Sequence, residues 1–281
     1  MITTLLILAV SRYDGTNGLW HELSRHPKVE MHGELFTWSN SLFARQCGGD
    51  RASHRHQVVH MLLAPEARCP GAALYEARHE KMGTARLVNR LIEQADSRDD
   101  VKKVMGFRLS PGNLPALQKK NALSFLLNQF TNLNIRIICI DFENKLRQFA
   151  HIKKAETREL SEVVIDAKEF YEFETCVDTF TQSLRDGVMD CREKRMDVDV
   201  LDVKVQRDFG TGADHDAALR KVFAFAGIKD PQVSGLYSVA GAVFRLRKFV
   251  EAHPIFEDVC DITNVASLPT NITTRFQGCA C

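Results

Sequence analysis

A short polar loop near the start of the chain carries residue types that bind phosphate groups. Residues 12–18 follow an apolar run and precede a predicted helix, where free backbone N–H groups and the positive end of the helix dipole favour an anion. Arg12 supplies a positive charge, and Gly15 allows close backbone approach. Thr16 and Asn17 supply side-chain donors. Because the Walker A pattern Gly-x-x-x-x-Gly-Lys-Ser/Thr is missing, the loop predicts an anion site of another kind; an ordinary turn capped by Thr16 is the alternative interpretation.

A glutamate just after a short predicted strand is a candidate proton acceptor. Residues 29–32 have the pattern of a strand, and Glu34 follows them closely. The carboxyl end of a strand lies near the expected cleft of a parallel α/β sheet, where a carboxylate can act as a general base. A solvated or loop-capping carboxylate is the alternative interpretation of Glu34.

Strands and helices alternate along the chain. Apolar runs typical of strands occur at 4–10, 29–32, 104–109, 135–140 and 198–203. Segments with helical periodicity lie between many of these runs. The alternation predicts a doubly wound α/β fold with a parallel sheet, in one domain that spans residues 1–281. The carboxyl ends of the strands are then expected to bring the phosphate loop and Glu34 to one edge of the sheet.

The composition excludes several classes of protein. The 281 residues include 37 Lys+Arg and 36 Asp+Glu, a net charge of +1, whereas nucleic-acid-binding proteins usually carry a basic excess. No run of 18 apolar residues occurs, so we expect no transmembrane segment. The apolar start at residues 1–10 lacks a basic flank and a cleavage pattern, which predicts a buried strand and not a signal peptide. Eight scattered cysteines without a Cys-x-x-Cys pair predict a reduced, cytoplasmic protein.

The histidines and cysteines predict no metal site. His56 and His60 are spaced i, i+4, but the residue between them that is a glutamate in zinc proteases is not acidic here. No Cys/His spacing fits a structural zinc site. The terminal Cys279 and Cys281 resemble the doubly prenylated ends of Rab-type small GTPases, although a plain exposed tail is the preferred interpretation.

The phosphate loop and the glutamate belong to a longer series of segments. In chain order these are Arg12, Gly15-Thr16-Asn17, His26-Pro27 and His32-Gly33-Glu34-Leu35-Phe36, followed by segments at 106–109, 135–149, 200–203, 219–227 and 256–276. The series resembles the PAPS-dependent sulfotransferases, in which PAPS is 3′-phosphoadenosine-5′-phosphosulfate. It is most similar to the bacterial carbohydrate sulfotransferases that sulfate trehalose and nodulation factors. The resemblance covers nearly the whole chain, in order.

The resemblance implies a fold and an activity. The implied fold is a three-layer, P-loop-like α/β fold with a central parallel sheet of about five strands flanked by helices. The implied activity is sulfuryl transfer from PAPS, without a metal, to a hydroxyl of a carbohydrate or another small molecule. Arg12 and Glu34 are the implied catalytic residues, with Glu34 as the base for the acceptor hydroxyl. The implied cofactor-binding residues are Arg12, Gly15, Thr16, Asn17, Arg147 and His151.

Two departures from the family affect the implied cofactor site. The phosphate loop is one residue longer, because Tyr13-Asp14 stands where the family has a serine, and the charge of Asp14 opposes that of a bound anion. Glu143 and His151 stand where the family has an arginine and a serine that hold the 3′-phosphate, and a glutamate repels phosphate. A predicted helix from about residue 143 places Arg147 on one face with both, where an Arg147–Glu143 ion pair is the alternative. The cations expected to compensate are Arg136, Lys145 and Arg147.

Three functions from different classes remain open. The first is an active PAPS-dependent sulfotransferase with a remodelled nucleotide site. The second is a catalytically impaired protein of the same fold that acts as a binding or interaction protein. The third is a P-loop-like phosphotransferase that uses another nucleotide, which the missing Walker lysine disfavours.

Overall fold

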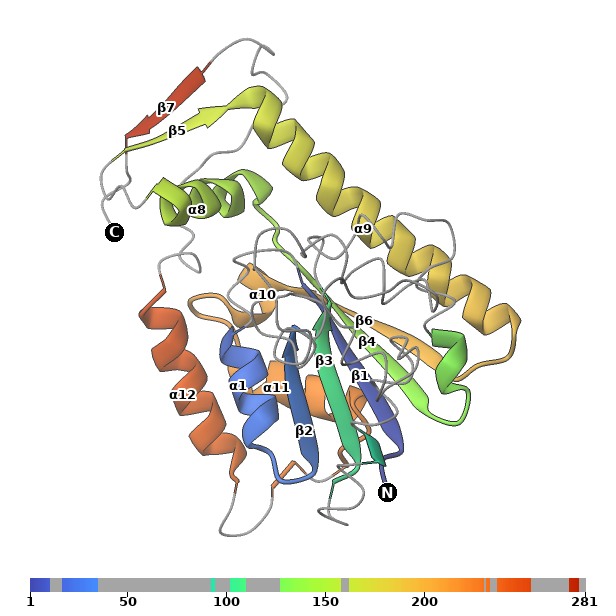
Figure 1. Ribbon diagram of the computed structural model, residues 1–281. Coiled ribbons are helices and arrows are strands. Elements are labelled where there is room, and N and C mark those ends of the chain that lie inside the picture. Colours follow the sequence, from blue (N-terminus) through green and yellow to red (C-terminus); the bar gives the residue numbers. More distant parts are fainter. Residues whose placement is uncertain are drawn as a thin grey trace, which may run out of the picture.

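The computed structural model describes residues 1–10, 17–34, 92–93, 102–109, 127–157, 162–229, 231–232, 237–253 and 273–277. Five strands in these residues form a parallel sheet in the order β2-β3-β1-β4-β6 (Figure 1). Their bounds are Thr4–Val10 for β1, Val29–Glu34 for β2, Val104–Leu109 for β3, Asn134–Asp141 for β4 and Val198–Lys204 for β6. Helices flank this sheet, so the expected three-layer α/β fold with a central parallel sheet of five strands is confirmed.

The central strand, β1, is buried along its whole length. It pairs in parallel with β3 on one side and with β4 on the other. Side chains alternate between the two faces of a sheet, and Leu6, Leu8 and Val10 lie in the main hydrophobic cluster. The other residues of β1 are buried as well. Burial on both faces is the physical reason for the continuous apolar run in the sequence.

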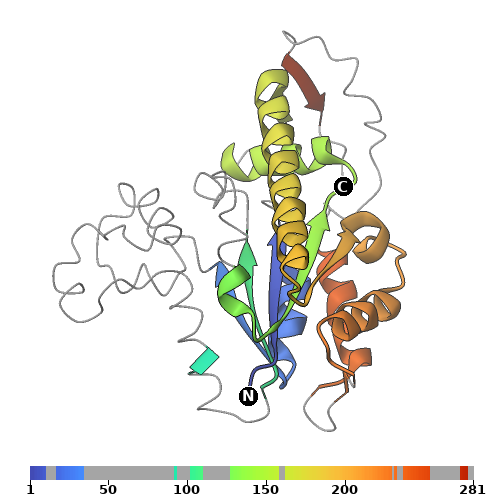
Figure 2. The same ribbon diagram turned by 90° about the vertical axis from the view of Figure 1, so that its right-hand side faces the viewer.

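Besides the short helix at Val205–Phe209, three helices share the main hydrophobic cluster with the sheet. They are α1 (Asn17–Arg25), α11 (His215–Phe225) and α12 (Val239–Glu251). Figure 2 shows α11 and α12, in orange, on one side of the strands. Leu23 of α1, Phe223 of α11 and Leu246 of α12 meet in the cluster. These helices form one outer layer of the fold.

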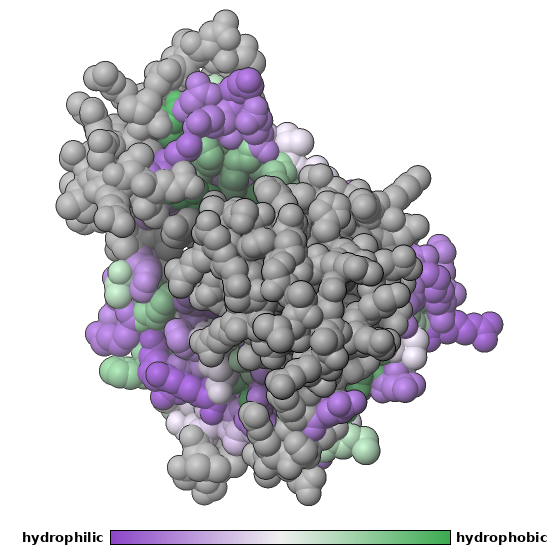
Figure 3. All heavy atoms as spheres, in the orientation of Figure 1, coloured by the Kyte–Doolittle hydropathy of each residue, from purple (hydrophilic) through white to green (hydrophobic). Residues whose placement is uncertain are grey.

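The long helix α9 (Ala167–Glu193) lies on the side of the sheet away from α12 (Figure 1). It packs against β6, and the charge of its Arg185 acts on Cys139 of β4. The buried residues of its central and last turns recur every three or four positions, as one helix face requires, at Val177, Phe180, Leu184, Val188 and Cys191. The opposite face meets water, and the surface over the last turns of α9 is hydrophilic (Figure 3).

A smaller cluster lies beyond the main sheet. It is formed by α8 (Lys145–Thr157), the first turns of α9 and β5 (Glu162–Asp166), which pairs antiparallel with β7 (Thr273–Gln277). Its buried residues are Leu146, Phe149, Ile165 and Phe170. The sequence patterns do not predict β5 and β7, because strands that pair across a long stretch of chain leave no local turn signal. Two short elements are the 3₁₀ turn η2 (Asn128–Phe130) and α10 (Val205–Phe209).

The start of α1 is held tightly against α12. A Cβ atom added to Gly18 would lie 2.6 Å from Cδ1 of Phe249 and 3.1 Å from Cδ1 of Leu246. One turn further on, Glu22 is only 3% exposed and accepts hydrogen bonds from Arg245 Nε at 2.9 Å and Nη2 at 2.7 Å. The hydrogen bond with Glu22 raises the pKa of the Arg245 guanidinium. Both contacts fix the beginning of the helix that follows the expected phosphate loop.

No helix in the described ranges is long and apolar enough to cross a membrane. The same residues bring together no group of three or more His, Cys, Asp or Glu side chains that is suited to a metal ion. The histidines at 56 and 60 and the two terminal cysteines lie outside the described residues.

Three described cysteines differ in how readily they can react. Cys139 and Cys191 are 7% and 0% exposed, whereas Cys176 on α9 is half-buried. Burial, and after it the charge of Asp202, raises the pKa of the Cys139 thiol to about 12. Burial also raises the pKa of Cys176. At pH 8 only about one Cys139 thiol in 10⁴ is then a thiolate, the form that reacts with alkylating agents.

We expect iodoacetamide to label Cys176 of the native protein at least about 100-fold faster than Cys139 or Cys191 at pH 8. In urea the three rates should converge, because unfolding removes the burial. Peptide mass spectrometry of a labelling time course measures each rate. Equal native rates for Cys139 and Cys176 would contradict the burial of β4 beneath α9.

Candidate anion-binding site at the carboxyl edge of the sheet

The strand order makes the end of β1 a point where chain connections diverge. From β1 the chain passes through α1 to β2, at one edge of the sheet. From β4 it passes through α8 and α9 to β6, at the other edge. Parallel α/β sheets bind ligands at such points, outside the carboxyl ends of the strands. The first described residue of α1, Asn17, follows β1 here, so the free N–H groups of the helix start favour an anion.

Four residues, which we call the α1 corner, surround the start of this helix. Arg108 of β3 donates from Nη2 to Oδ1 of Asn17 at 2.7 Å. The guanidinium carbon of Arg108 also lies 5.1 Å from the ring centre of Trp20, a cation–π distance. The indole Nε1 of Trp20 donates to the backbone carbonyl of His32 at 3.3 Å. The α1 corner thus ties α1, β2 and β3 together and holds a positive charge at the helix start.

The end of β2 is irregular where Glu34 lies. Met31 is opposite Gly106 of β3, and Glu34 is opposite Arg108, so β2 has one more residue than β3 in this stretch. Bulges of this kind occur next to active sites, where they change the direction of a strand. The backbone of Glu34 is therefore at the carboxyl edge, beside the residue that binds Asn17.

Several residues of the expected phosphate loop lie outside the described residues. These are Arg12, Asp14, Gly15 and Thr16. Their roles stay predictions. Asn17 is described, and its side chain accepts the hydrogen bond from Arg108.

His26, from the His26-Pro27 segment, is a structural residue. It is 0% exposed, and its Nδ1 accepts a hydrogen bond from the backbone N–H of Lys28 at 3.2 Å. Its ring lies 5.2 Å from the ring of Phe223 and 5.0 Å from that of Tyr237. The histidine therefore closes the end of α1 onto the core and has no direct place in the anion site.

The expectation that Glu143, Arg147 and His151 share one face of a helix is wrong for Glu143. The helix α8 begins at Lys145, because Asn144 caps it: Oδ1 of Asn144 accepts the N–H of Arg147 at 2.9 Å. Glu143 precedes the cap and does not lie on the helix. Arg147 and His151 stand one turn apart on α8, with Arg147 8% exposed and His151 half-buried.

Two of the cations expected to compensate for Glu143 have other partners. Arg136 is the third residue of β4, toward the amino end, and its guanidinium binds Asp197 through hydrogen bonds of 2.8 and 3.2 Å. It therefore lies near the amino ends of the strands, away from the carboxyl edge of the sheet, and its expected role is wrong. Lys145 forms an ion pair of 2.5 Å with Asp178 of α9.

The structure adds neighbours of Glu143 that the sequence does not reveal. Oε1 of Gln206, in α10, accepts the backbone N–H of Glu143 at 2.9 Å. The next residue is Arg207, and the hydrogen bond with Asp208 and the charges of Asp208 and Glu143 raise the pKa of its guanidinium. The sequence shows that α10 follows β6 directly, but only the structure shows that β6 lies beside β4, which brings α10 close to Glu143. Lys204, at the end of β6, forms an ion pair with Asp141 at the end of β4.

No protein-family model matches the chain, and no curated protein matches it either. A cation, a helix start and a bulged strand end meet at the carboxyl edge, which is an arrangement suited to a phosphate or sulfate group.

Proposed function

We propose that the protein transfers a sulfuryl group from PAPS to a hydroxyl of a carbohydrate or another small molecule. The observation that carries this proposal is the α1 corner, where Arg108 bonds Asn17 at the start of α1 beside the central strand. A helix start favours an anion, and the guanidinium adds a full charge. The series of sequence segments that resembles the PAPS-dependent sulfotransferases in order supports PAPS as the anionic cofactor.

In this proposal, the acceptor oxygen attacks the sulfur of PAPS and the bond from sulfur to the 5′-phosphate oxygen breaks. The leaving phosphate keeps the electron pair, and Arg12, Arg108 and the amides of residues 15–17 stabilise its charge. Glu34 takes the proton of the acceptor hydroxyl. Catalysis then rests on positioning and on charge stabilisation, as in phosphoryl transfer. The proposed ligands of the 3′-phosphate are Arg147 and His151.

A second candidate function is binding of a partner or glycan without transfer. The observation that favours it is Glu143, which stands just before α8 where the resembled family has an arginine. Arg207 is a nearby cation, but it is bound to Asp208 through hydrogen bonds of 2.9 and 3.0 Å. This segment then offers less positive charge to a 3′-phosphate than the family's does.

Binding of 3′-phosphoadenosine-5′-phosphate (PAP), the product nucleotide, separates the two functions. A PAPS-dependent enzyme binds PAP in its folded state, so its melting temperature rises saturably with PAP concentration. Adenosine 5′-phosphate, which lacks the 3′-phosphate, is the matched control and should stabilise the protein less. No stabilisation at millimolar PAP would contradict the transferase and leave the binding function in its place.

We expect Arg108→Met to weaken PAP binding by about tenfold or more, because a hydrogen bond to a charged group contributes about 1.5–3 kcal/mol. Isothermal titration calorimetry measures the affinity. Arg108→Lys should recover part of the loss, since it keeps the charge without the fork that binds two oxygens. Arg136→Met, at the opposite edge of the sheet, is the matched control. Equal affinities for Arg108→Met and Arg136→Met would remove Arg108 from the anion site.

A further inference from the structure

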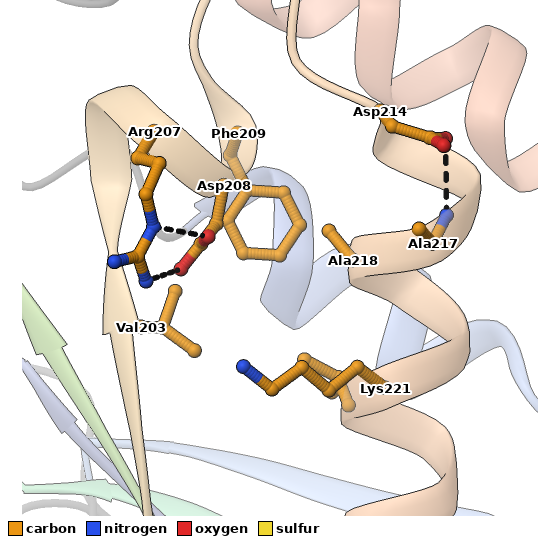
Figure 4. A pocket seen from close by; sticks show the side chains of 9 residues that line it. Val203, Arg207, Asp208, Phe209, Asp214, Ala217, Ala218 and Lys221 are labelled. Carbon is orange, nitrogen blue, oxygen red and sulfur yellow. Dashed lines mark hydrogen bonds and ion pairs between the residues drawn. The ribbon is translucent and has the colours of Figure 1, made fainter.

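A separate pocket of about 230 Å³ lies at the far edge of the sheet from β2, between β6, α10 and α11 (Figure 4). Its edge strand, β6, is two strands away from β1. The pocket wall is largely apolar, formed by Val203, Phe209, Ala218 and Val222. Three of these, Val203, Phe209 and Val222, belong to the main hydrophobic cluster, so the pocket reaches the core.

One carboxylate of the pocket is already neutralised. Asp208 accepts hydrogen bonds from Arg207 at 2.9 and 3.0 Å and from the backbone N–H of Lys204 at 2.9 Å. Burial raises the pKa of Asp208, but these hydrogen bonds and the charges of Arg207 and Lys221 lower it by more, so the net pKa lies below its ordinary value. The carboxylate therefore stays ionised and bound to Arg207, with little capacity left for a ligand cation.

The second carboxylate of the pocket, Asp214, also has a hydrogen-bond partner. Asp214 caps α11 by accepting the N–H of Ala217 at 3.1 Å, and Figure 4 shows this bond at the side of the pocket away from Arg207. Lys221, one turn after Ala217 on α11, extends its amino group toward Val203 and Asp208 in the same view. Within the described ranges, Lys221 has no hydrogen bond or ion pair at its amino group. Its charge acts on Asp208 without a direct ion pair, so its N–H donors can bind a ligand.

The size and the lining of the pocket point to one class of ligand. A cavity of about 150 Å³ lined by apolar side chains holds benzene, whereas pockets for drug-sized ligands begin at about 300 Å³. The volume here therefore suits one ring with one small substituent. The ring of Phe209 and the methyl groups of Val203 and Ala218 offer an apolar wall for it.

We propose that this pocket binds a small single-ring anion, with the ring against Phe209 and the anionic group on Lys221. A charge-assisted hydrogen bond to the ammonium fixes the orientation of the anionic group, and the apolar wall provides the remaining contact. Nothing in this proposal requires PAPS, since the pocket and the α1 corner lie on different strands.

Benzoate, benzyl alcohol and benzylamine are suitable probes, because they share a ring and differ in charge. Ligand-observed NMR titrations of the full chain should show saturable binding of benzoate, with affinity at least about tenfold above that of either other probe. Lys221→Met should remove this preference and leave the three affinities similar. Ala218→Leu, which fills the pocket without changing its charge, should abolish binding of all three.

Arg220→Met is the matched control, because Arg220 is exposed on the same helix and pairs with Asp216 instead of lining the pocket. It should leave benzoate affinity unchanged. Three outcomes would overturn the proposal: no saturable benzoate binding, equal affinity for benzoate and benzyl alcohol, or benzoate binding that survives Ala218→Leu. Thermal unfolding of each variant shows that it has folded, and the two variants test the charge and the cavity separately.

Discussion

Replacing Glu34 by glutamine is expected to lower the turnover of sulfuryl transfer by about 10²–10⁴-fold, the contribution typical of a general base. Glutamine has nearly the size of glutamate but cannot take the proton of the acceptor hydroxyl. Since the nucleotide binds through other residues, the affinity for PAP should change little. The loss should thus fall on kcat, and the KM for PAPS should stay close to that of the wild type.

Release of PAP from PAPS measures this loss, with the acceptor that supports the fastest turnover in a panel of carbohydrates and phenols. Glu30→Gln is the matched control, because Glu30 lies in the same strand near its amino end, where its carboxylate is 3.9 Å from His32. A turnover of Glu34→Gln equal to that of the wild type would remove Glu34 from the role of base. A fall in PAP affinity with unchanged kcat would instead give Glu34 a role in binding.

The elements of the main sheet are readable from the sequence, most clearly the central strands, because a strand buried on both faces is apolar at nearly every position. The expected strand at 135–140 is the core of β4, and the run at 4–10 coincides with β1. What the sequence does not show is their order. β3 lies between β1 and β2, although it follows both in the chain. Nothing local encodes which strands become neighbours.

The helix α12 is not predicted by the sequence patterns, although a local signal for it exists. Ser238 caps its first turn by accepting the N–H of Gly241 at 3.1 Å. The buried residues then recur at helical spacing, at Val239, Ala242, Leu246 and Val250. Basic residues and the exposed Phe244 lie between these buried positions, so the apolar stripe is not regular in the sequence.

The candidate site also contains some residues whose place local patterns predict and others whose place depends on strand pairing. Local patterns predict a helix after residue 18 and a strand over residues 29–32; α1 begins two residues earlier, at Asn17, and β2 extends two residues further, to Glu34. The place of Arg136 was also readable, since the third residue of a strand cannot reach the carboxyl edge. The nearness of Arg207 to Glu143 depends on the pairing of β4 with β6, and no spacing along the chain reveals it.

Replacing Arg245 by methionine is expected to lower the free energy of unfolding by about 2–4 kcal/mol. Glu22 is almost fully buried, and Arg245 supplies two of its hydrogen bonds, at 2.9 and 2.7 Å. The other partner within the described residues, Arg25, is more distant at 3.3 Å and its side chain is about half exposed. The variant thus leaves a buried carboxylate with weaker compensation. Urea unfolding followed by circular dichroism measures the change.

Arg247→Met provides the control, because Arg247 is exposed on the same helix, and it should change stability by less than about 0.5 kcal/mol. The double variant Glu22→Leu/Arg245→Met should recover most of the loss, since an apolar pair of similar volume avoids the cost of a buried charge. If Arg245→Met proves as stable as Arg247→Met, the ion pair does not hold α1 against α12. If the ion pair does hold it, Arg245→Met should also weaken PAP binding, because α1 then carries Asn17 away from Arg108. The double variant should restore that affinity together with the stability, which links the packing of α12 to the anion site.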